Sequence, residues 1–347
     1  TLLTRPGNVQ RWAATGLLVV LLAYVLFSTV KADAFNSNMP FGQGFHWPST
    51  RITAHTRLAQ HFIDMLPPGA SVSAQSSLAP HLSERSKIYL FPYADDQADY
   101  IFLDVNSDVY PFYGLPDYTH EVKKVLLRGD YGVVAAQDGY VLLKRGATPP
   151  AALPYSPSSD TSNVDDLLFH LSNNFCSFIS VPKEQVLHPL QVTFSGPDGT
   201  DAMNLVGYNV AAAGTFSLAS GYMQITTYWQ VNKPTLNALQ PVVLITDQDG
   251  GKHVVSADVS ALAWCPTSTW KAGFVLRLTS RVFSLSSFHM PNGLAHISIA
   301  LLPVTHPFAT VVDEQNWLPV HIAQAPAPIV PTQGTNALQL ATITLVP

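Results

Sequence analysis

Residues of two kinds in this sequence are suited to binding a polar ligand. The first kind is ionisable: a histidine with an arginine nearby, and an aspartate. His81 and Arg85 lie four positions apart, so a helical turn would place the imidazole and the guanidinium on the same side. There they could hold a phosphate or a sugar hydroxyl. The simpler interpretation, which we favour, is that residues 80–83 form a turn whose imidazole caps a neighbouring backbone group.

A carboxylate, Asp104, ends a run of apolar residues over 100–105, a place where α/β folds often carry functional acids. Asp95, Asp96 and Asp99 precede it, and clustered carboxylates can do acid–base work or bind Ca²⁺. We favour a solvated loop for these three, because the glycine-punctuated spacing of a calcium loop is missing. Asp104 is therefore the candidate that we carry forward as a ligand-binding residue.

Tryptophans are the second kind of candidate, because an exposed indole can stack on the apolar C–H face of a sugar ring. Trp264 and Trp270 flank a predicted turn, which could expose them. Trp229 alternates with Thr227 and Val231 along a predicted strand and is expected in the core. For Trp264 and Trp270 we also favour a structural role, in which they pin the turn, over a ligand platform.

Signatures of independent catalysis are missing from the sequence. It has no Gly-x-Ser-x-Gly elbow, no His-Glu-x-x-His or His-x-x-x-His spacing and no glycine-rich phosphate loop. We therefore name no catalytic residue, metal site or cofactor in this chain. Whether the chain belongs to an enzyme stays open.

The two cysteines, Cys176 and Cys265, allow two interpretations. An oxidising compartment would permit a disulfide between them. Neither lies in a Cys-x-x-Cys motif or has a metal-type partner nearby in the sequence. We favour two unpaired buried thiols and keep the disulfide as the alternative.

Residues Trp12–Val30 form the longest apolar segment, nineteen positions with no charge, no proline and one glycine. A helix of this length spans roughly 28 Å, close to the hydrocarbon thickness of a bilayer. The segment therefore predicts one membrane span. A cleaved signal peptide, with a weak Ala-x-Ala site in residues 31–34, and a buried helix of a soluble protein are the alternatives.

Charge gives the expected orientation and excludes one class of partner. Arg5 and Arg11 precede the span, which puts the N-terminus in the cytoplasm and the bulk of the chain outside the cell membrane. The net charge of -5 offers no basic surface for nucleic acid. Charged residues make up 12% of the chain, about half the usual quarter. The rest of the sequence is instead rich in Val, Thr, Ser, Pro and aromatic residues, the composition of β-structure outside the cytosol.

The rest of the sequence predicts two folded regions. Strands alternate with helices over 50–146 and end in a hairpin around Gln137-Asp138-Gly139, which is typical of a small α/β layer domain. Residues 147–162 are rich in Pro and Ser and predict an extended, poorly packed linker. Over 163–347, seven or more strand candidates predict an all-β sandwich with an irregular C-terminal tail. The segments ahead of these regions are a cytoplasmic stub (1–11), the transmembrane helix (12–30) and an extended lead-in (31–49).

Residues 65–92 and 98–104 contain distinctive motifs: Val-Ser-Ala-x-x-x-Leu-x-Pro-His-Leu-Ser-x-Arg at 72–85, Tyr-x-Phe-Pro at 89–92 and Ala-Asp-Tyr at 98–100. This stretch, roughly Phe41 to Arg145, resembles the C-terminal region of an uncharacterised family of bacterial polytopic membrane proteins. That family is similar to GT-C-type glycosyltransferases.

Three further motifs, at residues 204–209, 225–230 and 266–273, resemble a β-sandwich module found on mannosyltransferase-like membrane proteins. Thr227 departs from that pattern, which has an apolar residue before Tyr228-Trp229. Cys265 stands just ahead of the Pro-Thr turn of the third motif.

The two resemblances imply a function. The chain would be the non-catalytic extracytoplasmic C-terminal portion of a GT-C-like glycosyltransferase, which assists substrate positioning or cell-envelope contact. Its partners would be the membrane and a glycan or lipid-linked sugar. The alternatives are a single-pass surface protein that binds glycans or protein partners, and an accessory subunit of a membrane complex.

Overall fold

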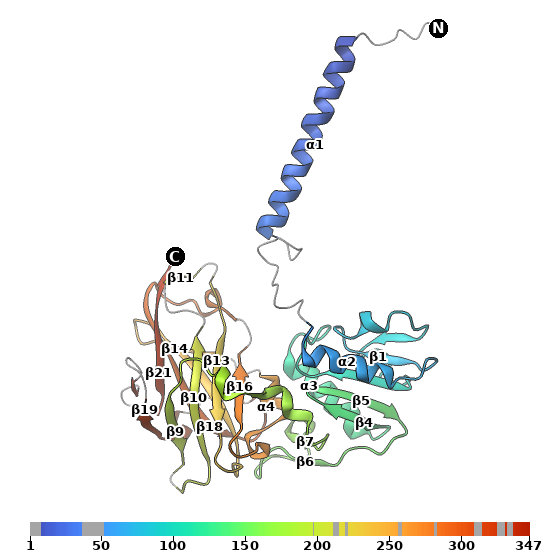
Figure 1. Ribbon diagram of the computed structural model, residues 1–347. Coiled ribbons are helices and arrows are strands. Elements are labelled where there is room, and N and C mark those ends of the chain that lie inside the picture. The colour runs from blue at the N-terminus through green and yellow to red at the C-terminus, as the bar shows by residue number, and fades with distance from the viewer. Residues whose placement is uncertain are drawn as a thin grey trace. The chain divides into compact units, whose positions relative to one another are not determined.

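The first element of the chain is a helix of 29 residues, α1 (Asn8–Asn36), drawn in blue in Figure 1. Its described apolar side chains are exposed, for example Leu18 at 57% and Phe27 at 68%. Within the described part of the chain, no helix combines the length and the apolar character needed to cross a membrane. The span over 12–30 stays a prediction.

This computed structural model describes residues 8–36, 52–196, 198–210, 215–218, 221–255, 259–280, 283–308, 314–324, 330–331 and 336–347. The predicted lead-in over 31–49 is helical as far as Asn36, and its remainder lies outside the described residues, as do the first seven residues of the predicted stub. The chain divides into two units, Thr1–Leu58 and Ala59–Pro347, and the described strands all belong to the second unit.

A five-stranded mixed sheet in the order β2-β1-β3-β5-β4 forms the centre of the α/β layer. Strand β1 is parallel to both of its neighbours, and β5 is antiparallel to β3 and β4. The central strand β3 is buried along its whole length. The strands are β1 (Val72–Ala74), β2 (Ile88–Leu90), β3 (Tyr100–Asp104), β4 (Tyr131–Gln137) and β5 (Tyr140–Arg145).

Successive side chains of a strand point to opposite sides, so β3 contributes apolar side chains to both faces of this sheet. A helix covers each face. On one face Phe102 of β3 stacks on Phe62 of α2, with ring centroids 5.7 Å apart. On the other face Ile101 and Leu103 join the core with Val122 of α3. The helices are α2 (Ala54–Asp64) and α3 (Leu115–Arg128). A short 3-10 helix, η2 (Ala79–Leu82), precedes β2.

Most residues of the Pro/Ser-rich segment 147–162 are exposed, and its buried residues are Tyr155 and Ser156. Strand β6 (Ala152–Pro154) pairs with β7 (Leu167–Phe169), ahead of which lies the 3-10 helix η3 (Val164–Asp166). Tyr155 is 2% exposed, and its hydroxyl donates to the carbonyl of Leu262 at 2.8 Å. Tyr155 is thus buried, whereas Pro154 and Pro157 beside it are exposed. The domain boundaries themselves stay a prediction.

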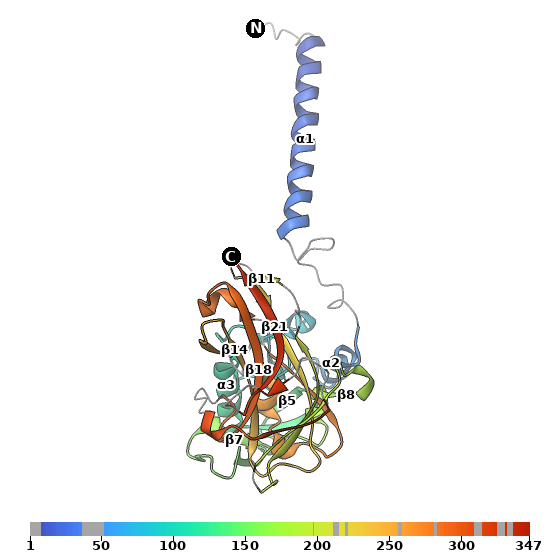
Figure 2. The ribbon, with the colours of Figure 1, turned by 90° about the vertical axis from the view of Figure 1, so that its left-hand side faces the viewer.

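Two six-stranded sheets make up the rest of the chain, and Figure 2 shows β14, β18 and β21 of the second one side by side. The first sheet runs β19-β9-β10-β13-β16-β8. The second runs β11-β21-β18-β14-β15, with β20 paired to β21. A small third pairing joins β12 to β17.

The strands of these sheets and of the small pairing lie between residues 180 and 346. They are β8 (Ser180–Val181), β9 (Gln191–Ser195), β10 (Ala202–Val210), β11 (Thr215–Ser217), β12 (Tyr222–Met223), β13 (Ile225–Gln230), β14 (Ala238–Thr246), β15 (Lys252–Val255), β16 (Val275–Thr279), β17 (Phe283–Ser284), β18 (Gly293–Val304), β19 (Val320–Gln324), β20 (Val330–Pro331) and β21 (Leu338–Val346).

The two sheets share one core, as expected of a β-sandwich. Trp229 of β13 is fully buried, which confirms its predicted place in the core, and its Nε1–H donates to Thr227 Oγ1 at 2.8 Å. Leu239 and Ile299 of the second sheet belong to the same cluster. That cluster continues into the α/β layer, where it includes Ile101. The predicted mixed architecture, mostly β, is confirmed at this coarse level.

Candidate functional site

His81 and Arg85 occupy different environments. His81 lies in η2 and is exposed. Arg85 donates from its guanidinium to the backbone carbonyls of Leu66 and Pro67, at 2.9 and 2.6 Å. These carbonyls follow the end of α2, where a helix leaves backbone acceptors without partners of its own. Arg85 therefore holds the chain at the end of α2.

The acidic residues before β3 are held by local contacts. Asp95 forms an ion pair with Arg128 at 2.8 Å. The Asp99 carboxylate accepts from the backbone N–H of Ser71 at 2.8 Å and from its hydroxyl at 2.7 Å, and these bonds lower the pKa of Asp99. Asp96 is exposed. The solvated loop that we expected is thus tied to the rest of the fold at two of its three acids.

Asp104 begins a loop whose conformation depends on a buried amide. Its carboxylate accepts from the N–H of Asn106 at 3.0 Å, and its own N–H donates to Gln75 Oε1 at 2.8 Å. Tyr118 donates to the same oxygen at 2.8 Å, and burial, aided by the Asp104 charge, raises the pKa of Tyr118 well above its ordinary value. Gln75 Nε2 in turn donates to the carbonyl of Asp108 at 2.6 Å. Gln75 thereby fixes both ends of the loop.

Trp264 and Trp270 are buried, at 4% and 3% exposure, so neither is an exposed stacking platform. The Nε1–H of Trp270 donates to the carbonyl of Cys265 at 2.9 Å. Trp264 packs edge-on against Phe175, with ring centroids 6.4 Å apart. The turn-pinning role that we favoured fits these contacts, because both indoles hold the segment around Cys265.

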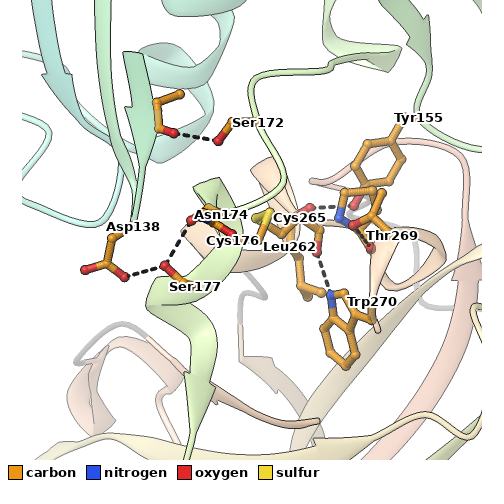
Figure 3. Close-up of a disulfide and its surroundings, with 12 residues drawn as sticks. Asp138, Tyr155, Ser172, Asn174, Cys176, Ser177, Leu262, Cys265, Thr269 and Trp270 are labelled. Atoms are coloured by element: carbon orange, nitrogen blue, oxygen red, sulfur yellow. Dashed lines mark hydrogen bonds between the residues drawn. A yellow bond between two sulfur atoms is a disulfide. The ribbon is translucent and has the colours of Figure 1, made fainter. Parts of the chain in front are cut away.

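Cys176 and Cys265 form a disulfide, with their Cα atoms 6.0 Å apart and 89 positions between them in the sequence (Figure 3). The two unpaired thiols that we favoured are therefore wrong, and the disulfide is the alternative that holds. The bond joins the 3-10 helix η4 (Phe175–Ile179) to the residue that follows α4 (Ser260–Trp264). Nothing in the spacing of the cysteines indicated this pairing, because it depends on a contact between distant segments.

Hydrogen bonds tie the same two helices to the α/β layer. The turn of the β4–β5 hairpin donates to η4, from the N–H groups of Asp138 and Gly139 to the carbonyls of Asn174 and Phe175, at 3.0 and 2.9 Å. Ser177 Oγ returns a bond to the Asp138 carboxylate at 2.9 Å, as Figure 3 shows. On the α4 side, the hydroxyl of Ser260 donates to the carbonyl of Val105, the residue after β3.

A cavity of about 630 Å³ lies at this junction, and we call it the junction cavity. Its walls come from the loop after β3, from η4, from the start of α4 and from β16. The wall residues that matter for binding are Asn106, Asp108, Phe178, Ser260, Arg277 and Thr279. Asp104 lies directly before this wall, so the sequence candidate marks the loop but not the residues that face the cavity.

The junction cavity presents opposite charges from its two sides. Asp108 belongs to the α/β layer and Arg277 to the sandwich, and no ion pair joins either of them to another residue in the described part of the chain. The remaining polar groups are neutral amides and hydroxyls, and the apolar wall includes Phe178. Such a lining can hold a small polar ligand with an apolar face.

A second cavity, of about 480 Å³, has Cys176 in its wall. Its lining is mostly apolar and includes Trp264, Trp270 and the half-exposed Phe274. The two cavities therefore differ in character. The polar one has the groups that a hydrogen-bonding ligand needs.

Comparison with known proteins finds one family. Residues 5–142 match a family described as "Predicted membrane protein (DUF2079)". The match covers α1 and the α/β layer as far as β5, and it does not extend to the sandwich. No curated protein and no solved structure matches the chain. The resemblance to an uncharacterised family of membrane proteins is confirmed, whereas the similarity to GT-C enzymes and the second module stay predictions.

Proposed function

We propose that this chain is a membrane-anchored, extracytoplasmic and non-catalytic region of a GT-C-like membrane glycosyltransferase, in which it positions a substrate or contacts the cell envelope. The observation that carries the placement is the disulfide between Cys176 and Cys265. Cytosolic thiols are kept reduced, so a structural disulfide is typical of an oxidising compartment beyond the membrane.

The anchor in this proposal is the apolar segment Trp12–Val30 within α1. Its described side chains expose apolar surface along the helix, including Leu22 at 61% and Leu26 at 69%. Lipid would cover that surface, and a helix satisfies its own backbone hydrogen bonds there. The family match supports the same assignment, since it begins at residue 5 and its description is of a membrane protein.

The positioning role rests on the junction cavity. It is built from both folded regions, and the disulfide fixes two of its walls, η4 and α4. A ligand held there would be fixed relative to the whole of residues 59–347. The similarity to glycosyltransferases makes a sugar or a sugar-bearing lipid the expected ligand.

Thiol accessibility in the native host tests the placement. Spheroplasts that express the full chain are lysed in a maleimide-polyethylene glycol reagent, with and without prior reduction. We expect no mass increase without reduction and two additions after it, whereas a Cys176→Ser variant should react once without reduction. Two additions without reduction would mean free thiols, and resistance to protease added outside the spheroplasts would mean a cytoplasmic location. Either result overturns the placement.

The reading frame upstream of Thr1 tests the enzymatic parent. Eight or more further hydrophobic spans in the same frame would support a polytopic GT-C-like protein. An initiator Met within a few residues of Thr1 would overturn that part and favour the single-pass surface protein. Copurification with a separate large membrane protein would favour the accessory subunit instead.

A further inference from the structure

We infer that the junction cavity binds an uncharged saccharide, with one sugar ring against Phe178 and its hydroxyls held between Asp108 and Arg277. This inference deepens the proposed function and rests on it for the class of ligand. The size of the cavity, about 630 Å³, lies within the range of roughly 300–1,000 Å³ that small-molecule sites occupy.

Asp108 offers a carboxylate that the fold has positioned but not used. Its backbone carbonyl accepts from Gln75 Nε2 at 2.6 Å, which fixes the residue in the loop. Gln75 is itself 1% exposed and is held by the N–H of Asp104. In the described part of the structure, no hydrogen bond or ion pair engages the Asp108 carboxylate. A carboxylate accepts two hydrogen bonds side by side, which suits two adjacent hydroxyls.

Arg277 supplies the complementary donor from the opposite region. It lies in the middle of β16, paired in register with Tyr228 of β13, so its backbone is fixed by the sheet. Its side chain is exposed and lines the cavity. Its guanidinium makes no hydrogen bond with any residue that the structure describes. The planar fork of an arginine donates to two neighbouring oxygen atoms, such as the ring oxygen and a hydroxyl of a sugar.

Phe178 provides the apolar contact that a pyranose ring needs. It is half-buried and held edge-on by Phe175, with ring centroids 6.1 Å apart and planes at 68°. Behind it the turn of the β4–β5 hairpin is close, since a Cβ added at Gly139 would lie 3.4 Å from Phe178 Cδ1. The ring is thus supported from two sides.

The balance of charge selects an uncharged ligand. The cavity wall carries one carboxylate and one guanidinium, and its other polar groups are neutral, among them the Asn106 amide. An anionic ligand would meet Asp108 and a cationic one would meet Arg277. A saccharide uses both groups as hydrogen-bond partners and brings no charge of its own.

Binding to the full chain in detergent micelles tests the inference. The probes are the methyl glycosides of mannose, glucose and galactose, with glucuronic acid and glucosamine as charged counterparts, followed by saturation-transfer NMR and calorimetry. We expect at least one neutral glycoside to bind, and Asp108→Asn, Arg277→Gln and Phe178→Ala each to weaken it about tenfold or more. The matched controls Asp249→Asn, Lys233→Gln and Phe274→Ala, which lie outside the junction cavity, should leave binding unchanged.

The outcomes separate this inference from the proposed function. No binding of any neutral glycoside, or binding that the three cavity variants leave intact, overturns the inference. Glucuronic acid bound in preference, with dependence on Arg277 alone, would also overturn it and indicate an anion site. Phe178→Tyr keeps an aromatic ring and checks that loss in Phe178→Ala is not misfolding. The thiol-labelling result is independent of all of these, so the proposed function fails or stands on its own measurement.

Discussion

The α/β layer and the β-sandwich use their cationic side chains in opposite ways. In the α/β layer Arg85, Lys123, Arg128 and Arg145 all donate to backbone carbonyls, and each of these carbonyls is between 19 and 47 positions away in the sequence. In the described part of the sandwich no lysine or arginine makes such a bond. Its one described ion pair that involves a lysine, Lys252 with Glu314, is between side chains.

This difference distinguishes the arginine in the sequence motif from the arginine that lines the junction cavity. Arg85 stands in the most distinctive motif of the sequence, and the backbone around the end of α2 occupies it. Arg277 stands in no motif, and it faces the junction cavity. Whether an arginine side chain stabilises the fold or binds a ligand depends on the hydrogen-bond acceptors around it. These acceptors are brought together only in the folded chain.

The largest effect is expected at the disulfide, which joins two segments of the 163–347 region that are both hydrogen-bonded to the α/β layer. Replacing both Cys176 and Cys265 by serine removes a cross-link that closes a loop of 89 positions. Constraint of the unfolded chain over such a loop is worth about 4 kcal/mol. The free energy of unfolding of the full chain in micelles, measured with denaturant, should fall by about that amount. The wild-type chain under reducing conditions is the control and should match the double variant. A loss below about 1 kcal/mol would contradict a stabilising role for this cross-link.

A smaller effect should appear as a pH dependence of the α/β layer. Lys123 is fully buried in α3, where burial lowers its pKa from 10.5 to about 8, against the opposing attraction of Asp165 and Asp166. Between pH 8 and 10.5 the unfolded chain keeps the proton that the folded chain has released, so stability gains from this residue as the pH rises. The gain is about 3 kcal/mol across that window and is absent below it.

The measurement for Lys123 is a difference between two chains. Unfolding free energies of wild type and Lys123→Met are compared from pH 7 to pH 10.5 in steps, so that the titration of other groups cancels. The free energy of unfolding of the wild type should rise relative to that of the variant as the pH rises. A constant difference would show that Lys123 keeps its ordinary pKa in the folded chain.

The two arginines give the most direct test of the comparison. Arg85→Ala removes the guanidinium donors to the carbonyls of Leu66 and Pro67, of which Pro67 keeps a bond from the N–H of Ala70, and we expect a loss of about 2 kcal/mol in the free energy of unfolding. Arg277→Ala should cost less than about 0.5 kcal/mol, as for a surface position without partners. Thermal and denaturant unfolding of both variants decide this. Equal losses would remove the distinction between the two regions.

Much of the fold could be predicted because its signals are local. The hairpin around residues 137–139 forms as expected, since Asp138 and Gly139 both have positive φ, at 52° and 86°, as the tightest hairpin turns require. Helix α3 ends at Arg128, with Gly129 in the left-handed conformation that glycine favours after a helix. It begins at Leu115, and its first turn contains Pro116 at a position where proline is favoured.

Local patterns in the sequence did not identify the residues of the candidate site. The junction cavity draws Asp108, Phe178 and Arg277 from three segments far apart in the sequence, and none of them stands in a recognisable motif. The sequence reached the loop through Asp104, but it could not show that Gln75 sets the conformation of that loop. The disulfide was missed for the same reason, since a pairing over 89 positions depends on the packing of η4 against α4.

Strand β21 lies between β18 and β11, so the second sheet needs residues 338–346 before its interior hydrogen-bond ladders are complete. The ribosome synthesises the chain from the N-terminus, so β18 leaves the ribosome before its partner β21 has been made. Until then β18 is an unsatisfied edge rich in isoleucine and leucine, the kind of template on which foreign strands aggregate. The synthesis of residues 305–346 is therefore the period in which β18 is open to aggregation and in which a holding chaperone would protect it.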